Sequence, residues 1–151
     1  MTALFTLLEA IKKELNDNKL INQVTFGNLM EVELEKTNIY PLAHVGIQTG
    51  SIGSATSTIE VSILFLDIVD DNKEITTDKF YGNDNEEYVM NEMFSAATKT
   101  AQELLRGTLF SNGFEVYDEI ETEFFTERFK DKLAGCGITM NVTLQNNLDL
   151  C

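Results

Sequence analysis

The sequence is poor in several residue types on which large classes of protein depend. Its 151 residues include no tryptophan, one proline, one histidine and two cysteines. Two cysteines are too few for a disulfide scaffold, so we expect a protein whose thiols stay reduced, as in the cytosol. One histidine and two cysteines also lack the ligand spacing of a zinc site. These scarcities argue against the disulfide-rich and zinc-stabilised classes of small domain.

Basic residues are scarce as well. Eleven Lys and Arg stand against 25 Asp and Glu, which gives a formal net charge of −14 at pH 7. Non-specific binding to nucleic acid or to anionic lipid needs clustered positive charge, so this balance argues against both. No apolar run reaches the ~18 residues that span a membrane, and we expect no membrane partner. With 43% hydrophobic residues, the chain is suited to one domain over 1–151.

Hydrophobic periodicity predicts two principal helices. One stripe over 3–16 consists of apolar residues three and four positions apart, Leu4, Phe5, Leu8, Ile11 and Leu15, and a second stripe runs over 86–106. The polar cluster at 16–18 ends the first helix, and Gly107 is placed to cap the second. Both stripes are typical of helices that bury one side.

Elsewhere the pattern has a period of two and predicts strands. The alternating segments are 24–26, 30–35, 42–47, 58–68, 114–117 and 138–144. Small polar residues at 48–57 indicate a flexible hairpin tip, and the acidic stretch 67–87 indicates a loop. Leu64 and Leu66 make one end of a strand apolar on both faces, so we expect that end to be covered twice. Short connections favour a mainly antiparallel sheet with the helices packed on one face, an α+β domain.

No catalytic set emerges from the residues that carry chemistry. His44 stands alone in a predicted strand, where a packed or hydrogen-bonding role is the usual one. The glycine-rich segment 50–54 lacks the Gly-Lys-Ser/Thr ending of a phosphate-binding loop. A calcium loop starting at Asp70 would have Ile75 where glycine is required and Tyr81 where glutamate is required. We therefore predict no catalytic residues, no metal and no cofactor, and an enzyme acting through His44 or a carboxylate pair ranks third among the hypotheses.

Each cysteine has a structural interpretation. Cys136 lies between Gly135 and Gly137 beside the last predicted strand, where a small buried thiol fits. Cys151 is the last residue of the sequence, and such positions are usually mobile. We expect two free thiols and no disulfide.

The negative charge is concentrated in two blocks. Residues 67–92 hold nine acids and two bases, and residues 115–127 hold six acids and no base. Three interpretations stay open: a solvated surface that serves solubility, an acidic mimic of DNA that occupies a basic protein groove, or the wall of a passage for DNA. A phosphate chain moves freely only where no Lys or Arg pairs with it, and a negative wall repels it.

The order of these segments resembles a known layout. The helix TALFTLLEAIKKEL leads into VTFGNLMEVEL, and NIYPLAHVGIQTG and STIEVSILFLDIVDD then flank a small-residue hairpin. NEEYVMNEMFSAATKTAQELLRGTLF supplies a long helix and KLAGCGITMNVTLQNNLDLC the final strand. In this layout the chain is similar, over nearly its whole length, to the tail-terminator (tail-completion) and neck proteins of tailed bacteriophages. Those proteins are small α+β domains that assemble into rings where the head joins the tail.

The resemblance implies a structural virion protein, assembled in the host cytoplasm, without catalytic residues. It implies a homo-oligomeric ring of six or twelve copies that contacts portal-side and tail-side proteins. DNA would pass through the lumen of this ring without specific binding. The strong net charge is a departure, because the family does not require it. The competing hypothesis from another class is an acidic DNA mimic that inhibits a basic nucleic-acid-binding protein.

Two segments are the candidate intersubunit surfaces. The first is the hairpin tip, 50–57. Ordering its small, flexible residues costs conformational entropy, which contacts with a partner's surface would offset. The second is the acidic loop, 70–87, which is long for a segment without regular structure inside a small domain. The candidate interface residues are Gly50, Ser51, Ile52, Gly53, Ser54, Asp70, Asp71, Asn72, Phe80, Tyr81 and Asn85. Phe80 is the expected apolar anchor, and the competing interpretation of the loop is a mobile surface segment.

Overall fold

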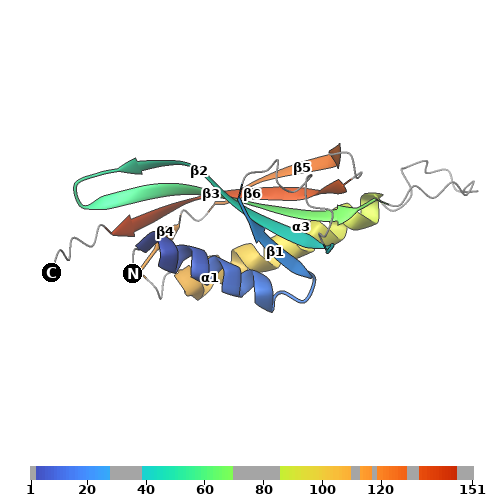
Figure 1. The fold of residues 1–151 in the computed structure, drawn as a ribbon, viewed down its shortest axis with the longest axis horizontal. Helices are drawn as coiled ribbons and strands as arrows, with labels where there is room; N and C mark the ends of the chain where they lie inside the picture. The colour runs from blue at the N-terminus through green and yellow to red at the C-terminus, as the bar shows by residue number, and fades with distance from the viewer. Residues whose placement is uncertain are drawn as a thin grey trace, which may run out of the picture.

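Two helices lie on one face of a six-stranded sheet in the described part of the computed structural model (Figure 1). The structure describes residues 3–27, 39–69, 86–109, 113–116, 119–128 and 133–145. The predicted strand at 30–35 and most of the predicted acidic loop lie outside these residues. The predicted α+β class, with an N-terminal helix and a second long helix packed on the sheet, is confirmed.

Helix α1 covers Ala3–Asp17, one residue more than the predicted 3–16. Leu7, Ile11 and Leu15 form its inner stripe, and all three are fully buried. Their spacing of four residues brings them onto one side of the helix, which is the side that packs on the sheet. The predicted helix is therefore confirmed, but its buried stripe is only partly the predicted one, because Phe5 is 50% exposed and Leu7, which the predicted stripe omitted, is fully buried.

Helix α3 covers Glu86–Glu103 and continues into a wider, π-helical turn, η1, over Leu104–Thr108. In this turn the Leu109 N–H donates to the carbonyl oxygen of Leu104, five residues earlier. Because a π turn takes one residue more than an α turn, Leu104 and Leu109 lie nearly above one another, and both are buried. The predicted cap at Gly107 is wrong: the glycine lies inside the wide turn, which keeps both leucines in the core.

The sheet contains strands of very different length. The strands are β1 Gln23–Phe26, β2 Leu42–Ile52, β3 Thr56–Ile68, β4 Glu115–Val116, β5 Glu121–Arg128 and β6 Leu133–Gln145. Their order is β1-β2-β3-β6-β4, and β5 also pairs with β6. β1 runs parallel to β2, and every other described pair is antiparallel. The prediction of a mainly antiparallel sheet is confirmed, with one parallel edge that the sequence did not indicate.

The hairpin between β2 and β3 is more regular than predicted. Residues 48–57 were expected to form a flexible tip, but β2 continues to Ile52 and β3 begins at Thr56. A bulge after Ile47 shifts the register, and pairing then resumes, with Ile52 opposite Ser57. The reason is that small polar residues carry the same backbone donors and acceptors as any others, so the ladder does not depend on their side chains. The turn itself is only 53–55.

The strand β5 was missed, and β6 is longer than the predicted 138–144. β5 lies in the second acidic block, where Phe124 and Phe125 stand next to each other and interrupt any simple alternation. β6 begins at Leu133 because it pairs along its first half with both β3 and β5. Two-sided pairing, rather than side-chain pattern, sets the length of this strand.

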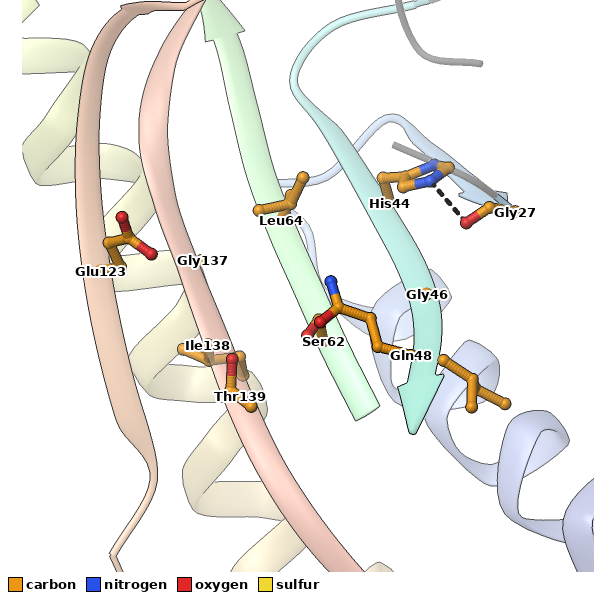
Figure 2. A pocket seen from close by; sticks show the side chains of 11 residues that line it. Gly27, His44, Gly46, Gln48, Ser62, Leu64, Glu123, Gly137, Ile138 and Thr139 are labelled. Carbon is orange, nitrogen blue, oxygen red and sulfur yellow. Dashed lines mark hydrogen bonds between the residues drawn. The ribbon is translucent and has the colours of Figure 1, made fainter. Parts of the chain in front are cut away.

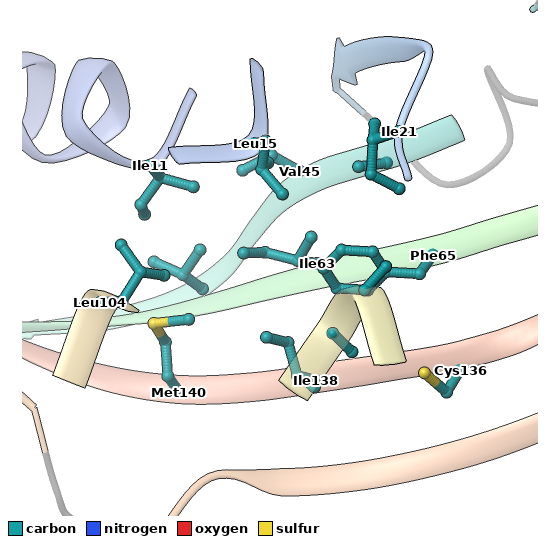
Figure 3. Close-up of a cluster of buried hydrophobic side chains, with 14 of the residues drawn as sticks. Ile11, Leu15, Ile21, Val45, Ile63, Phe65, Leu104, Cys136, Ile138 and Met140 are labelled. Atoms are coloured by element: carbon teal, nitrogen blue, oxygen red, sulfur yellow. The ribbon is translucent and has the colours of Figure 1, made fainter. Parts of the chain in front are cut away.

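The main core lies between the helices and the sheet (Figure 3). Alternate residues of the central strands point into it, among them Ile63 and Phe65 of β3 and Ile138 and Met140 of β6. A second, smaller cluster lies on the other face at one end of the sheet. It consists of Leu42, Leu66, Phe125 and Leu133, with Tyr40 and Leu64 packed against it. The expectation that this end of β3 is covered on both faces is confirmed.

Candidate functional site on the open face of the sheet

The face of the sheet opposite the helices, here called the open face, carries no described helix (Figure 1). Side chains that are opposite one another in the ladder point to the same face. Ser62 is opposite Gly46 on one side and Thr139 on the other, and Glu121 is opposite Thr139. These residues alternate with the buried core positions, so they belong to the open face.

A hollow of about 600 Å³ crosses the middle of this face. Two of the positions in the central rows are glycines, Gly46 and Gly137, and the missing side chains leave the backbone uncovered. Leu64 leans into the space above Gly137, where an added Cβ would be 2.8 Å from the leucine Cδ2. Figure 2 shows the polar groups that point into the hollow, with the helices behind the sheet. They are the side chains of Gln48, Ser62, Glu123 and Thr139.

His44 lies at the edge of this hollow, on β2, and its ring forms hydrogen bonds with β1 and the residue that follows it. Its Nε2 is 3.1 Å from the carbonyl oxygen of Gly27, and its Nδ1 is 2.7 Å from Oγ1 of Thr25 (Figure 2). A carbonyl oxygen only accepts, so Nε2 carries the hydrogen, and in the neutral ring Nδ1 accepts from the threonine hydroxyl. The ring is almost fully buried. The predicted hydrogen-bonding role of His44 is confirmed.

The two faces of the sheet differ in charge, because the helix layer carries both signs, with acids such as Glu9, Glu14 and Glu92 beside its bases. Four acidic residues have open-face positions in the ladder: Glu60, Glu115, Glu121 and Glu123. The basic side chains that the structure describes lie instead on the helices or in the turn after α1: Lys12, Lys13, Lys19, Lys99 and Arg106. Within the described side chains, the open face therefore carries negative charge only.

The predicted interface residues fall into two groups. Gly50, Ser51 and Ile52 lie in the exposed far half of β2, and Gly53 and Ser54 lie in the turn that follows. Ile52 is 90% exposed. The others, Asp70, Asp71, Asn72, Phe80, Tyr81 and Asn85, lie outside the described residues. The structure therefore places the hairpin group at one end of the molecule and leaves the acidic-loop group a prediction.

Cys136 faces the main core from β6 and is a free, buried thiol. Burial raises the pKa of this thiol to about 12, because an apolar environment disfavours the thiolate. A thiol in that state is a poor nucleophile and a poor metal ligand. No three His, Cys, Asp or Glu of the described chain are grouped as a metal site would require. Neither described helix is long and apolar enough to cross a bilayer.

The open face itself was missed in the sequence. Its signal was present in β5, where Glu121, Glu123 and Phe125 alternate with Thr122 and Phe124. The alternation was hidden because phenylalanines stand on both faces of this strand: Phe125 belongs to the small cluster, whereas Phe124 contacts Phe94 of α3. The net charge of the block 115–127 could be counted from the sequence. The face of the sheet to which its acidic side chains point could not, because that depends on how β5 pairs with β6.

Comparisons with known proteins add no function. No family model matches the chain, and no curated protein matches it. Among solved structures, the chain aligns with the mycobacterial sensor histidine kinase MprB at 8% identity, over 94% of each chain, with a TM-score of 0.28. A likeness at that score carries no argument about this chain.

Proposed function

We propose that the protein is a structural component of a tailed-phage virion. It forms a homo-oligomeric ring at the head–tail junction, joins portal-side to tail-side components and surrounds a channel for DNA. The observation that carries the proposal is the charge of the open face: it bears Glu60, Glu121 and Glu123 without a described base, whereas the helix layer carries both acids and bases.

A channel for DNA needs a wall that does not hold the phosphates. Each Lys or Arg that pairs with a phosphate adds affinity and slows movement, whereas carboxylates repel the strand over about a Debye length, roughly 10 Å at 0.1 M salt. The open face has this character, and the hollow lined by Gly46, Ser62 and Gly137 leaves room above its middle. We therefore assign the open face to the lumen and the helix layer to the outside of the ring.

The test is the assembly state of the purified protein, measured by native mass spectrometry and viewed by negative-stain electron microscopy. The proposal expects a species of six or twelve copies with a central hole. A monomer or dimer at every protein and salt concentration would contradict it. The acidic DNA mimic predicts that second result, together with tight binding to a basic nuclease or repressor that weakens steeply as salt rises.

The assignment of the lumen has its own test. Glu121→Lys with Glu123→Lys places two positive charges on the open face, and Glu9→Lys with Glu14→Lys makes the same change of charge on α1. In a ring whose lumen is the open face, only the first pair should retain double-stranded DNA in a gel-shift assay. Retention by the α1 variant, or by neither variant in an intact ring, would place the lumen elsewhere.

A further inference from the structure

The end of the β2–β3 hairpin presents an apolar side chain without a described cover. Ile52 is 90% exposed, although an isoleucine gains about 1.5–3 kcal/mol from full burial. The residues around it, 46–59, include no charged side chain. In a chain of net charge −14, such a segment is one of the few that can approach another copy without adding repulsion.

A second exposed apolar surface lies elsewhere on the molecule. Phe94 of α3 and Phe124 of β5 are in ring contact, with centroids 5.3 Å apart and an interplanar angle of 43°. They stay 44% and 48% exposed. Two other described phenylalanines, Phe5 on α1 and Phe26, are about half exposed but lie singly, and Phe26 already has the Lys12 ammonium over its ring.

The two surfaces cannot meet within one chain. Phe124 is opposite Cys136, and Cys136 is opposite Phe65. The turn of the hairpin adjoins Thr56, which is nine residues from Phe65 along β3. Nine residues of strand span roughly 30 Å at about 3.3 Å per residue. β3 and β6 also separate β2 from β5. Figure 1 shows the hairpin at one end of the molecule, with β5 and the start of α3 toward the other.

We infer that Ile52 of one copy packs against the Phe94–Phe124 pair of a second copy. The contact is heterologous, because each copy gives a hairpin and receives one, and such contacts generate rings when the rotation between copies closes. The inference rests on the proposed ring and names its intersubunit anchor. An aliphatic side chain on two tilted rings is the kind of small apolar centre that dominates binding energy at interfaces.

Cross-linking between two variants, each with one added surface cysteine, tests this contact directly. Ile52→Cys and Phe124→Cys are each made with Cys151→Ser, while Cys136 stays buried as in the native protein. The two proteins are mixed, allowed to exchange copies and treated with a short bis-maleimide. The inference expects a covalent dimer that contains one copy of each variant. The matched control replaces Phe124→Cys by Phe5→Cys, on α1 and 50% exposed, and should give no such dimer.

Each outcome decides the matter. Rings seen by native mass spectrometry, with cross-linking no greater than in the Phe5→Cys control, would overturn the contact and leave the proposed ring standing. Ile52→Cys that cross-links mainly to itself would show tip-to-tip pairing and also overturn it. A protein that never assembles would contradict both the contact and the ring.

A second measurement uses the strength of assembly. Ile52→Ser should raise the protein concentration at half-assembly by about tenfold or more, as expected for an anchor residue. Ile39→Ser removes the same side chain from a position that is 59% exposed and should leave that concentration unchanged. Equal effects of the two substitutions would mean that Ile52 is no anchor.

Discussion

Gly135 shows how closely β6 approaches β3. Its φ is +156°, and a Cβ added there would overlap the backbone carbonyl oxygen of Phe65. A backbone oxygen cannot swing aside as a side chain can, so the strands must separate. We expect Gly135→Ala to lower the free energy of unfolding by about 3 kcal/mol or more, as measured by urea denaturation.

Gly107→Ala is the matched control for that substitution. An added Cβ at Gly107 meets nothing within 4 Å, and the residue lies in a helical turn, where alanine is the better former. Its free energy of unfolding should equal or slightly exceed that of the wild type. If the two variants were equally stable, the close approach at Gly135 would not exist in solution.

The thiol of Cys136 gives a prediction about pH. Burial raises its pKa from 9.0 to about 12, so the folded protein keeps the proton at a pH where the unfolded chain has released it. This contribution to stability is complete below about pH 9 and is lost as the pH rises toward 12. The urea midpoint should therefore fall between pH 8 and pH 10.5, and it should fall less in Cys136→Ala. An identical pH dependence in both proteins would show that the thiol is not responsible.

At the scale of elements, Asn18 joins the two helices. Its Nδ2 donates to the carbonyl oxygen of Ala96 at 3.1 Å and to Oγ1 of Thr100 at 3.2 Å, and its Oδ1 accepts from the Leu20 N–H at 3.0 Å. The side chain is buried, so its removal leaves polar groups without a partner. Asn18→Ala should lower the free energy of unfolding by about 1–3 kcal/mol.

The control is the same substitution two residues earlier. Asn16 is exposed at the end of α1, and Asn16→Ala should change stability by less than about 0.5 kcal/mol. Thermal or urea unfolding of the two variants side by side is sufficient. A similar small effect of both would mean that the link between α1 and α3 contributes little.

The helices and the inner faces of the strands could be predicted because burial imposes a period on the sequence. Ile11 and Leu15 are spaced for one side of a helix, and Ile63 and Phe65 for one face of a strand. The far half of β2 could not be predicted in this way, because it is held by backbone hydrogen bonds and its side chains from Gln48 to Ile52 are exposed. The parallel pairing of β1 could not be predicted for a different reason: a strand of four residues carries too short a pattern to fix its direction.

The candidate site was predictable only in part. Gly50, Ser51 and Ile52 were selected for their small or uncharged character, and they do lie at an exposed end of the molecule. The open-face acids were recognised as a block, 115–127, without a direction, because the face to which Glu121 and Glu123 point depends on pairing with β6. A site made by register between distant segments leaves no local signature in either of them.

At the scale of the whole molecule, net charge governs association. Six copies of a chain with a charge of −14 carry −84 in total (6 × −14), and this repulsion opposes a ring that apolar contacts hold together. Salt screens it, since the Debye length falls from about 10 Å at 0.1 M to about 3 Å at 1 M. Sedimentation at 0.05 M and 0.5 M NaCl should show a larger assembled fraction at the higher salt. Weaker assembly at high salt would instead indicate ion pairs between copies.

The long pairing of β3 with β6 also bears on how the protein is made. Thr56 pairs with Gln145 and Ile68 with Leu133, so partners in the central ladder are 65 to 89 positions apart in the chain. During translation β3 can therefore pair only with β2 at first, because its other partner strand, β6, is synthesised later, from residue 133 onward. Ladders of such separation form slowly, and the nascent strand from Ile59 to Leu66 exposes apolar residues throughout the delay, which makes it a natural segment for a chaperone to hold.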